Sequence, residues 1–183
     1  KKYDQDSWRY TYLLSPSRFC SEKLTSAFHL KKFGKENCIV EKGYPRNDFL
    51  FRFTPEDVAR IRRELGLPEG KKVVLYAPTF RRNREYQTDD LLRAMDWDKY
   101  VLIVKGHPLK ELEVSDSQAE TCDSYSAMEL LPAADIVITD YSAISIEAAA
   151  LLKPVYFYTY DLEEYARDTG LNIDLEAEMP GCV

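Results

Sequence analysis

Residues 136–158 constrain the fold more than any other part of the chain. Residues 136–138 are three uncharged, β-branched positions, which is typical of a fully buried strand in a parallel sheet. Turn and N-cap residues follow at 139–142, and helix-forming residues continue from 143 to 152. Lys153 and Pro154 stop that helix, and residues 155–158 return to strand character. The segment therefore predicts a strand–helix–strand unit.

The turn at 139–142 is also the first candidate for a binding site. It lies between the carboxyl end of a strand and the start of a helix, where free backbone N–H groups and a partial positive charge suit a phosphate or diphosphate. Glu147, about one turn into the helix, faces the same crevice and can accept the two hydroxyls of a ribose. An ordinary capped helix fits the same spacing equally well, because caps of this kind are common.

Similar strands recur along the chain and define the fold class. Apolar runs at 72–76 and 100–104 alternate with the helices predicted at 54–65, 89–95 and 124–131, and a further helix is expected over 160–170. This alternation predicts an α/β protein with a doubly wound parallel sheet. Neither a G-x-G-x-x-G nor a G-x-x-x-x-G-K-[ST] motif is present, so a phosphate site has to be assembled from several strand ends.

Two other predicted strands also end in polar residues. Thr79 and Arg81 follow the strand at 72–76, and arginine can hold phosphate oxygens with two parallel hydrogen bonds. The strand at 100–104 runs into Lys105, Gly106, His107 and Pro108, in which the imidazole can donate to a phosphate and the glycine allows a close approach. Parallel sheets bind ligands outside these ends, so we expect the three loops to converge. A pair of solvated arginines is the alternative for residues 81–82.

Composition narrows the classes of function. The 183 residues carry a net charge of −6 with both signs interspersed, which does not favour a nucleic-acid partner. No apolar run approaches the roughly 20 residues that span a bilayer. The four cysteines are scattered without metal-type spacing, so we expect reduced thiols in a cytosolic protein, with no metal and no cofactor. The chain starts at Lys1 without an initiator methionine, and we expect it to be part of a larger protein.

Five motifs in order resemble a known family. They are GYPRND at 43–48, LYAPTFR at 75–81, KGHP at 105–108, ITDYSA at 138–143 and FYTYDLEEYARDTGL at 157–171. Together they are similar to the CDP-glycerol glycerophosphotransferases of teichoic acid synthesis, the TagF and TagB-like group, over essentially the whole chain.

The resemblance implies a GT-B fold of two Rossmann-like domains with the active site between them. Residues 1–48 then correspond to the end of the acceptor-side domain and a linker, and residues 49–183 to the domain that binds the CDP-linked donor. The reaction implied is attack by a hydroxyl of a membrane-linked teichoic acid or capsule acceptor on the β-phosphate of CDP-glycerol, or of another CDP-alditol, with release of CMP. The family's second histidine, the catalytic base, belongs to the amino-terminal domain, so this fragment alone is expected to be inactive.

The resemblance also implies roles for particular residues. His107 matches a histidine that contacts the diphosphate, and Arg81 lies in the matching basic loop; these two are the predicted catalytic residues. The predicted substrate-binding residues are Thr79, Lys105, Gly106, Pro108, Thr139, Asp140, Ser142, Ala143 and Glu147.

Two departures from the family pattern leave the donor open. Ala143 stands where the second serine of TDYSS is usual, and Glu147 replaces a more usual aspartate, so the alditol can be glycerol, ribitol or another group. Two alternatives are a GT-B glycosyltransferase or epimerase that uses a UDP-sugar, and a nucleotide-binding module without catalysis. The lipid-linked acceptor implies a peripheral location at the inner face of the cell membrane.

Overall fold

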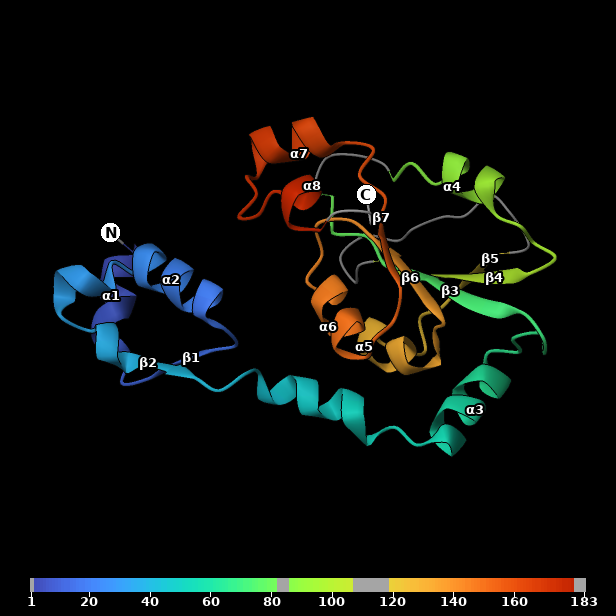
Figure 1. Ribbon diagram of the computed structural model, residues 1–183, viewed down its shortest axis with the longest axis horizontal. Helices are drawn as coiled ribbons and strands as arrows, with labels where there is room; N and C mark the ends of the chain where they lie inside the picture. The colour runs from blue at the N-terminus through green and yellow to red at the C-terminus, as the bar shows by residue number, and fades with distance from the viewer. Residues whose placement is uncertain (1, 82–85, 107–118, 180–183) are drawn as a thin grey trace. The chain divides into compact units, whose positions relative to one another are not determined.

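The computed structural model describes residues 2–81, 86–106 and 119–179. The chain divides into two compact units, Lys1–Phe51 and Arg52–Val183 (Figure 1). The predicted division between residues 48 and 49 falls inside the 3₁₀ helix η3 (Pro45–Arg52). That the first unit belongs to a preceding domain remains a prediction.

The first unit contains a pair of short parallel strands with helical segments beside it. Leu13 pairs with Ile39 in the register of these two strands. The elements are α1 (Lys2–Arg9), β1 (Leu13–Ser15), α2 (Arg18–Ala27), η1 (Leu30–Phe33), η2 (Glu36–Cys38) and β2 (Ile39–Glu41). Ser17 caps α2 by accepting a hydrogen bond from the backbone N–H of Cys20 at 3.3 Å, as expected for a serine before a first helical turn.

The second unit is built on a five-stranded sheet in which all strands are parallel. The strands are β3 (Lys72–Tyr76), β4 (Tyr100–Val104), β5 (Ala119–Thr121), β6 (Ile136–Thr139) and β7 (Val155–Phe157), in the order β5-β4-β3-β6-β7. The chain moves outward from β3 through β4 to β5, and then returns to the other side of β3 with β6. The order of strands therefore reverses between β3 and β6, which is where such sheets form a ligand crevice.

Helices cover both faces of this sheet (Figure 1). They are α3 (Pro55–Glu64), α4 (Asp89–Ala94), α5 (Ala127–Leu130), which continues as η4 (Leu131–Ala133), α6 (Ile144–Ala150), α7 (Leu162–Asp168) and α8 (Leu175–Glu178). The helix predicted over 124–131 starts later than expected, because Ser126 caps it by accepting from the N–H of Glu129. Thr54 and Asp57 form the same reciprocal capping box at the start of α3.

The core lies on the two sides of β3 and β4. On one side, Val74 and Tyr76 pack with Leu91 and Leu92 of α4. Residues of opposite parity on β3, such as Leu75, are also buried, which explains the uninterrupted apolar runs in the sequence. The predicted α/β class with a parallel sheet is confirmed.

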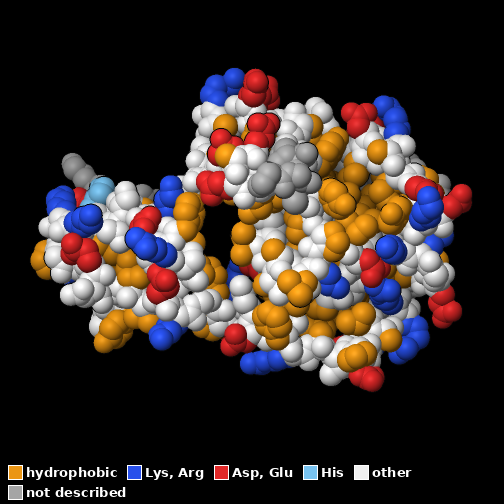
Figure 2. Space-filling view, viewed as in Figure 1, with side chains coloured by type: hydrophobic (Ala, Val, Ile, Leu, Met, Phe, Trp, Pro, Cys, Tyr) orange, Lys and Arg blue, Asp and Glu red, His pale blue; other side chains and the backbone are white. Residues whose placement is uncertain are grey.

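The surface shows no strong separation of charge on the face drawn in Figure 2, where acidic and basic side chains are interspersed. Among the described residues, no helix combines the length and the apolar character that crossing a membrane requires.

Candidate functional site

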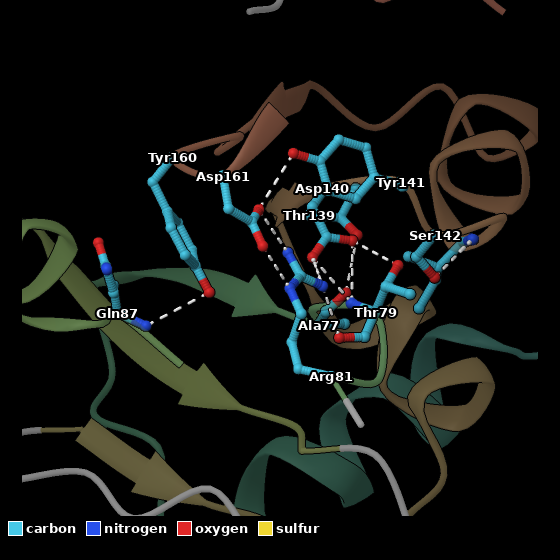
Figure 3. A network of polar contacts seen from close by, with 11 residues as sticks. Ala77, Thr79, Arg81, Gln87, Thr139, Asp140, Tyr141, Ser142, Tyr160 and Asp161 are labelled. Carbon is cyan, nitrogen blue, oxygen red and sulfur yellow. Dashed lines mark hydrogen bonds and ion pairs between the residues drawn. The ribbon is translucent and has the colours of Figure 1, made fainter. Parts of the chain in front are cut away.

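The candidate site lies at the carboxyl edge of the sheet, where β3 and β6 are neighbours. Val74 pairs with Ile136 in this register, so the loops that follow the two strands leave the sheet side by side. Figure 3 shows that these loops and the segment after β7 meet in one network of polar contacts. The predicted convergence of loops is thus observed for the loops after β3 and β6.

Asp140, the first residue after β6, anchors the loop after β3. Its carboxylate accepts hydrogen bonds from the backbone N–H of Thr79, at 2.9 Å to each oxygen, and from the Thr79 hydroxyl at 2.5 Å. Only 1% of the Asp140 residue surface is exposed, so the carboxylate is directed into the protein. Both residues were predicted to bind substrate, and the structure pairs them with each other.

Arg81 lies between two carboxylates. Its Nε and Nη2 donate to the two oxygens of Asp161 at 2.8 and 3.0 Å, and its Nη1 lies 2.9 Å from an oxygen of Asp140. Nη1 also donates to the carbonyl of Thr79 at 2.8 Å. The Arg81 side chain is only 3% exposed, so the solvated pair of arginines considered for residues 81–82 does not describe Arg81.

Three tyrosine rings surround the guanidinium of Arg81. Its central carbon lies 5.3 Å from the ring centroid of Tyr141, 5.7 Å from that of Tyr160 and 5.3 Å from that of Tyr165, all within the range of cation–π attraction. Burial alone lowers the pKa of Arg81, but the hydrogen bonds that it donates to Asp161 and the nearby carboxylate charges outweigh burial and raise the pKa above its ordinary value. Burial, followed by the charge of Asp161, likewise raises the pKa of Tyr141. Arg81 is therefore a cation and Tyr141 a neutral hydrogen-bond donor at neutral pH.

The other predicted residues of the β6–α6 segment differ in their exposure. Thr139 is fully buried, and its hydroxyl donates to the carbonyl of Ala77 at 2.7 Å. Ser142 is half-buried, and its hydroxyl accepts from the N–H of Ile144 at 3.4 Å. Ala143 is exposed at the start of α6, and Glu147 is buried in the first turn of that helix. Of these four positions, Ser142 and Ala143 are therefore the ones that solvent reaches.

The third predicted loop is described only in part. Lys105 donates from its ammonium group to the carbonyl of Cys122 at 2.6 Å and lies 3.8 Å from a carboxylate oxygen of Asp123. Gly106 follows at the end of the described range, and His107 and Pro108 lie outside the described residues.

Sequence reasoning missed Asp161 as a member of this network. The run from 160 to 170 predicts a helix with a solvated acidic face, whereas only 9% of Asp161 is exposed. One signal was available, since Asp161 lies in the segment that follows β7, four residues after the strand ends, and Asp140 likewise comes after β6. Within the described ranges, no group of three or more His, Cys, Asp and Glu side chains could hold a metal ion.

A concave surface occurs within the first unit. It is a cleft of about 1010 Å³ lined by Arg18, Ser21, Glu22, Thr25, Ser26, His29, Lys31, Lys32, Glu36, Ile39 and Glu41. Its charges are partly paired locally, as in the contact of 3.2 Å between Arg18 and Glu22. None of the residues predicted for the functional site lines this cleft, so the carboxyl edge of the five-stranded sheet remains the better candidate.

Comparison with known proteins points to one family. The sequence model described as CDP-Glycerol:Poly(glycerophosphate) glycerophosphotransferase matches residues 1–183. A teichoic acid poly(glycerol phosphate) polymerase of Bacillus spizizenii is 33% identical over 99% of this chain and 49% of its own length. A teichoic acid glycerol-phosphate primase of Bacillus subtilis is 36% identical over 88% of this chain and 44% of its own length. The chain thus spans about half the length of these relatives.

Solved structures agree with this result. The wall teichoic acid polymerase TagF, in a variant soaked with CDPG, superposes with a TM-score of 0.78 and 32% identity over 98% of this chain and 46% of its own. A UDP-GlcNAc 2-epimerase from Neisseria meningitidis bound to UDP-GlcNAc superposes with a TM-score of 0.55 over 82% of this chain and 45% of its own. At 16% identity this second likeness shows the fold alone, and it supports the GT-B type.

Proposed function

Because this chain belongs to the CDP-glycerol:poly(glycerophosphate) glycerophosphotransferase family, we propose that it is the donor-binding part of a transferase that uses CDP-glycerol or a related CDP-alditol. The observation that carries the proposal is the family match over residues 1–183. The relatives named above are glycerol-phosphate polymerases and primases, which supports glycerol phosphate as the group transferred.

The architecture supports the same assignment of roles within the chain. The second unit holds a parallel sheet whose strand order reverses between β3 and β6, and ligands of such sheets bind at that point. Ser142 and Ala143 lie there at the start of α6, where backbone N–H groups favour phosphate oxygens. The donor's diphosphate binds beside this segment and His107. Glu147 is only 4% exposed, so its contact with the ribose requires the nucleotide to displace the groups that cover this carboxylate.

The proposed reaction is a displacement at phosphorus. A hydroxyl oxygen of the acceptor forms a new bond to the β-phosphorus of the donor, the bond between that phosphorus and the bridging oxygen breaks, and CMP leaves with the bond's electrons. The proton of the attacking hydroxyl passes to a base. The protein's contribution is to hold the phosphates and to stabilise the charge that develops on their oxygens.

The family match also supports a proposal for the acceptor and for the location. The proposed acceptor is a lipid-linked teichoic acid or capsule polymer, and the proposed location of the intact protein is the cytoplasmic face of the membrane that holds this lipid. The part of the relatives that this chain does not cover supplies the acceptor side and the catalytic base.

A thermal-shift panel of CDP, UDP and GDP tests the nucleotide assignment. A ligand at 100 times its dissociation constant stabilises the folded state by about 2.7 kcal/mol. For a chain of this size, that corresponds to an increase in Tm of about 5–10 °C. We expect CDP to give this shift. Stabilisation by UDP but not by CDP would overturn the proposal in favour of an enzyme that uses a UDP-sugar.

A second experiment tests the ribose contact of Glu147. CDP and 2′-deoxy-CDP differ in one hydroxyl, and a hydrogen bond to a charged group contributes about 1.5–3 kcal/mol. The unmodified protein should bind CDP more tightly, and Glu147→Gln should reduce the difference between the two nucleotides. Glu163→Gln, at an exposed position on α7, is the control that should leave the difference intact.

A further inference from the structure

The buried guanidinium of Arg81 connects three loops at the carboxyl edge of the sheet. The loop after β3 supplies Arg81, the loop after β6 supplies Asp140, and the segment after β7 supplies Asp161. Their side chains are 3%, 1% and 7% exposed. One guanidinium thus faces two carboxylates in a region that water scarcely reaches.

Because Arg81 contacts both Asp161 and Asp140, the position of one carboxylate constrains the position of the other. A guanidinium is planar, and its donors form a rigid fork. Asp161 holds the edge formed by Nε and Nη2 with two hydrogen bonds, which fixes the direction in which Nη1 points toward Asp140. Asp140 in turn begins the loop that leads to Ser142 and Ala143.

Tyr141 provides a second connection between Asp161 and the loop after β6, in addition to the one through Arg81. The hydroxyl of Tyr141 donates to Asp161 at 3.1 Å, and its ring stacks on Tyr165 of α7 with centroids 4.0 Å apart and planes 19° apart. Asp161 therefore contacts the loop after β6 both through Arg81 and through the neighbour of Asp140 (Figure 3).

We propose that Asp161 is a positioning residue, which holds residues 140–143 through Arg81 and Tyr141 in the conformation that receives the diphosphate of the donor. The inference rests on the proposed function and assigns Arg81 to this support. Direct contact with phosphate would require Arg81 to leave a buried carboxylate without its partner, which is strongly unfavourable.

The main test compares Asp161→Asn with a matched control at the other end of β6. Asp135 lies just before this strand and pairs with Arg62 at 2.9 Å, as Asp140 lies just after it and pairs with Arg81. In the intact protein, Asp161→Asn should weaken CDP binding about tenfold or more, as expected for the loss of a charge-assisted hydrogen bond. Asp135→Asn should leave the dissociation constant for CDP unchanged. Equal CDP affinity in Asp161→Asn and the unmodified protein would overturn the inference.

Arg81→Lys separates positioning from direct phosphate binding. Lysine keeps the charge but loses the fork, so a positioning role predicts a loss of CDP affinity as large as that of Asp161→Asn. The double variant should then bind CDP no worse than either single variant, because both changes break the same connection. Retention of CDP binding in Arg81→Lys would show that the guanidinium fork is not needed for the site and would overturn the inference.

Amide hydrogen exchange provides a readout without a ligand. Asp161→Asn should speed exchange in peptides that cover residues 140–146, whereas Asp135→Asn should not. If the unmodified protein bound no CDP, the proposed function would fail, and unchanged exchange in Asp161→Asn would refute the positioning role separately.

Should Asp161→Asn not fold, Tyr141→Phe removes one hydrogen bond to Asp161 and should weaken CDP binding about threefold. An unchanged affinity in that variant would count against the inference.

Discussion

Replacing Arg81 by methionine keeps a flexible, extended side chain, shorter than arginine, but removes the positive charge that Asp140 and Asp161 share. Removing one partner of a buried ion pair costs about 3–5 kcal/mol, because the remaining charge is left without compensation. Here two carboxylates lose their partner, and their side chains are only 1% and 7% exposed. We therefore expect a loss in the upper part of this range, about 4–5 kcal/mol.

The assay is urea unfolding monitored by circular dichroism, with Arg62→Met as the matched control. Arg62 also pairs with an aspartate at 2.9 Å, but Arg62 and Asp135 are each 35% exposed, and solvent screening reduces the contribution of such a pair to about 1 kcal/mol or less. With a denaturant slope of about 1–3 kcal/mol/M, the midpoint of Arg81→Met should fall by about 2 M, far more than that of the control. Similar losses in the two variants would show that the surroundings of Arg81 are solvated and would refute the reasoning.

Three further predictions concern other parts of the second unit. Tyr76 is fully buried, and its hydroxyl has no hydrogen-bond partner among the described residues, so Tyr76→Phe should raise the unfolding free energy by about 1 kcal/mol; a loss would reveal a partner. The hydrogen bond from the backbone of Thr54 and that from Arg60 lower the pKa of Asp57 below its ordinary value of 3.8. The contribution of Asp57 to the stability of the folded state is therefore complete above pH 3.8 and is lost as the pH falls through the folded pKa. Unfolding measured from pH 7 to 2 should therefore show a weaker acid dependence in Asp57→Asn. His107→Ala should lower transfer by the intact protein by about two to three orders of magnitude without changing its Tm, and normal turnover with a lower Tm would refute the assignment.

The strands that could be predicted are those that carry apolar runs. β3, β4 and β6 have a neighbouring strand on each side, and the sequence shows them as apolar runs, whereas β7 lies at an edge and carries an apolar run of which Phe157 is buried. β5 (Ala119–Thr121) has no such run, because two of its three residues are exposed. Its pairing depends on the backbone edge that β4 offers, with Leu102 opposite Ala119, and a local pattern does not record that.

The sequence likewise predicts one part of the candidate site and does not predict another. The rule for parallel sheets was sufficient to predict that the loops after β3 and β6 meet, because it needs only the positions of the strands. The pairing of Arg81 with Asp161 joins residues 80 positions apart, and their charges alone suggested two solvated side chains. Burial reverses that interpretation, since charged groups this deep in a protein have to be paired.

A buried ion pair of this kind gives little stability when it is compared with apolar residues of similar volume, so its presence at the carboxyl edge suggests a different benefit. A triple variant separates stability from function. Arg81→Met and Asp161→Leu remove both ends of the bidentate contact, while Asp140→Asn keeps an oxygen that can accept from the N–H of Thr79. Because no unpaired buried charge remains, this variant should be more stable than Arg81→Met alone and should unfold within about 1–2 kcal/mol of the unmodified protein.

Binding of CDP should nevertheless be strongly weakened in the triple variant, because the stacking of Tyr141 on Tyr165 is then the one described contact left between the loop after β6 and α7. Calorimetric titration at a temperature where the variant is fully folded measures this directly, and the dissociation constant of the Asp135→Asn protein serves as the reference. A triple variant that is as stable as the unmodified protein and binds CDP with the same affinity would show that the buried charges serve neither stability nor the site.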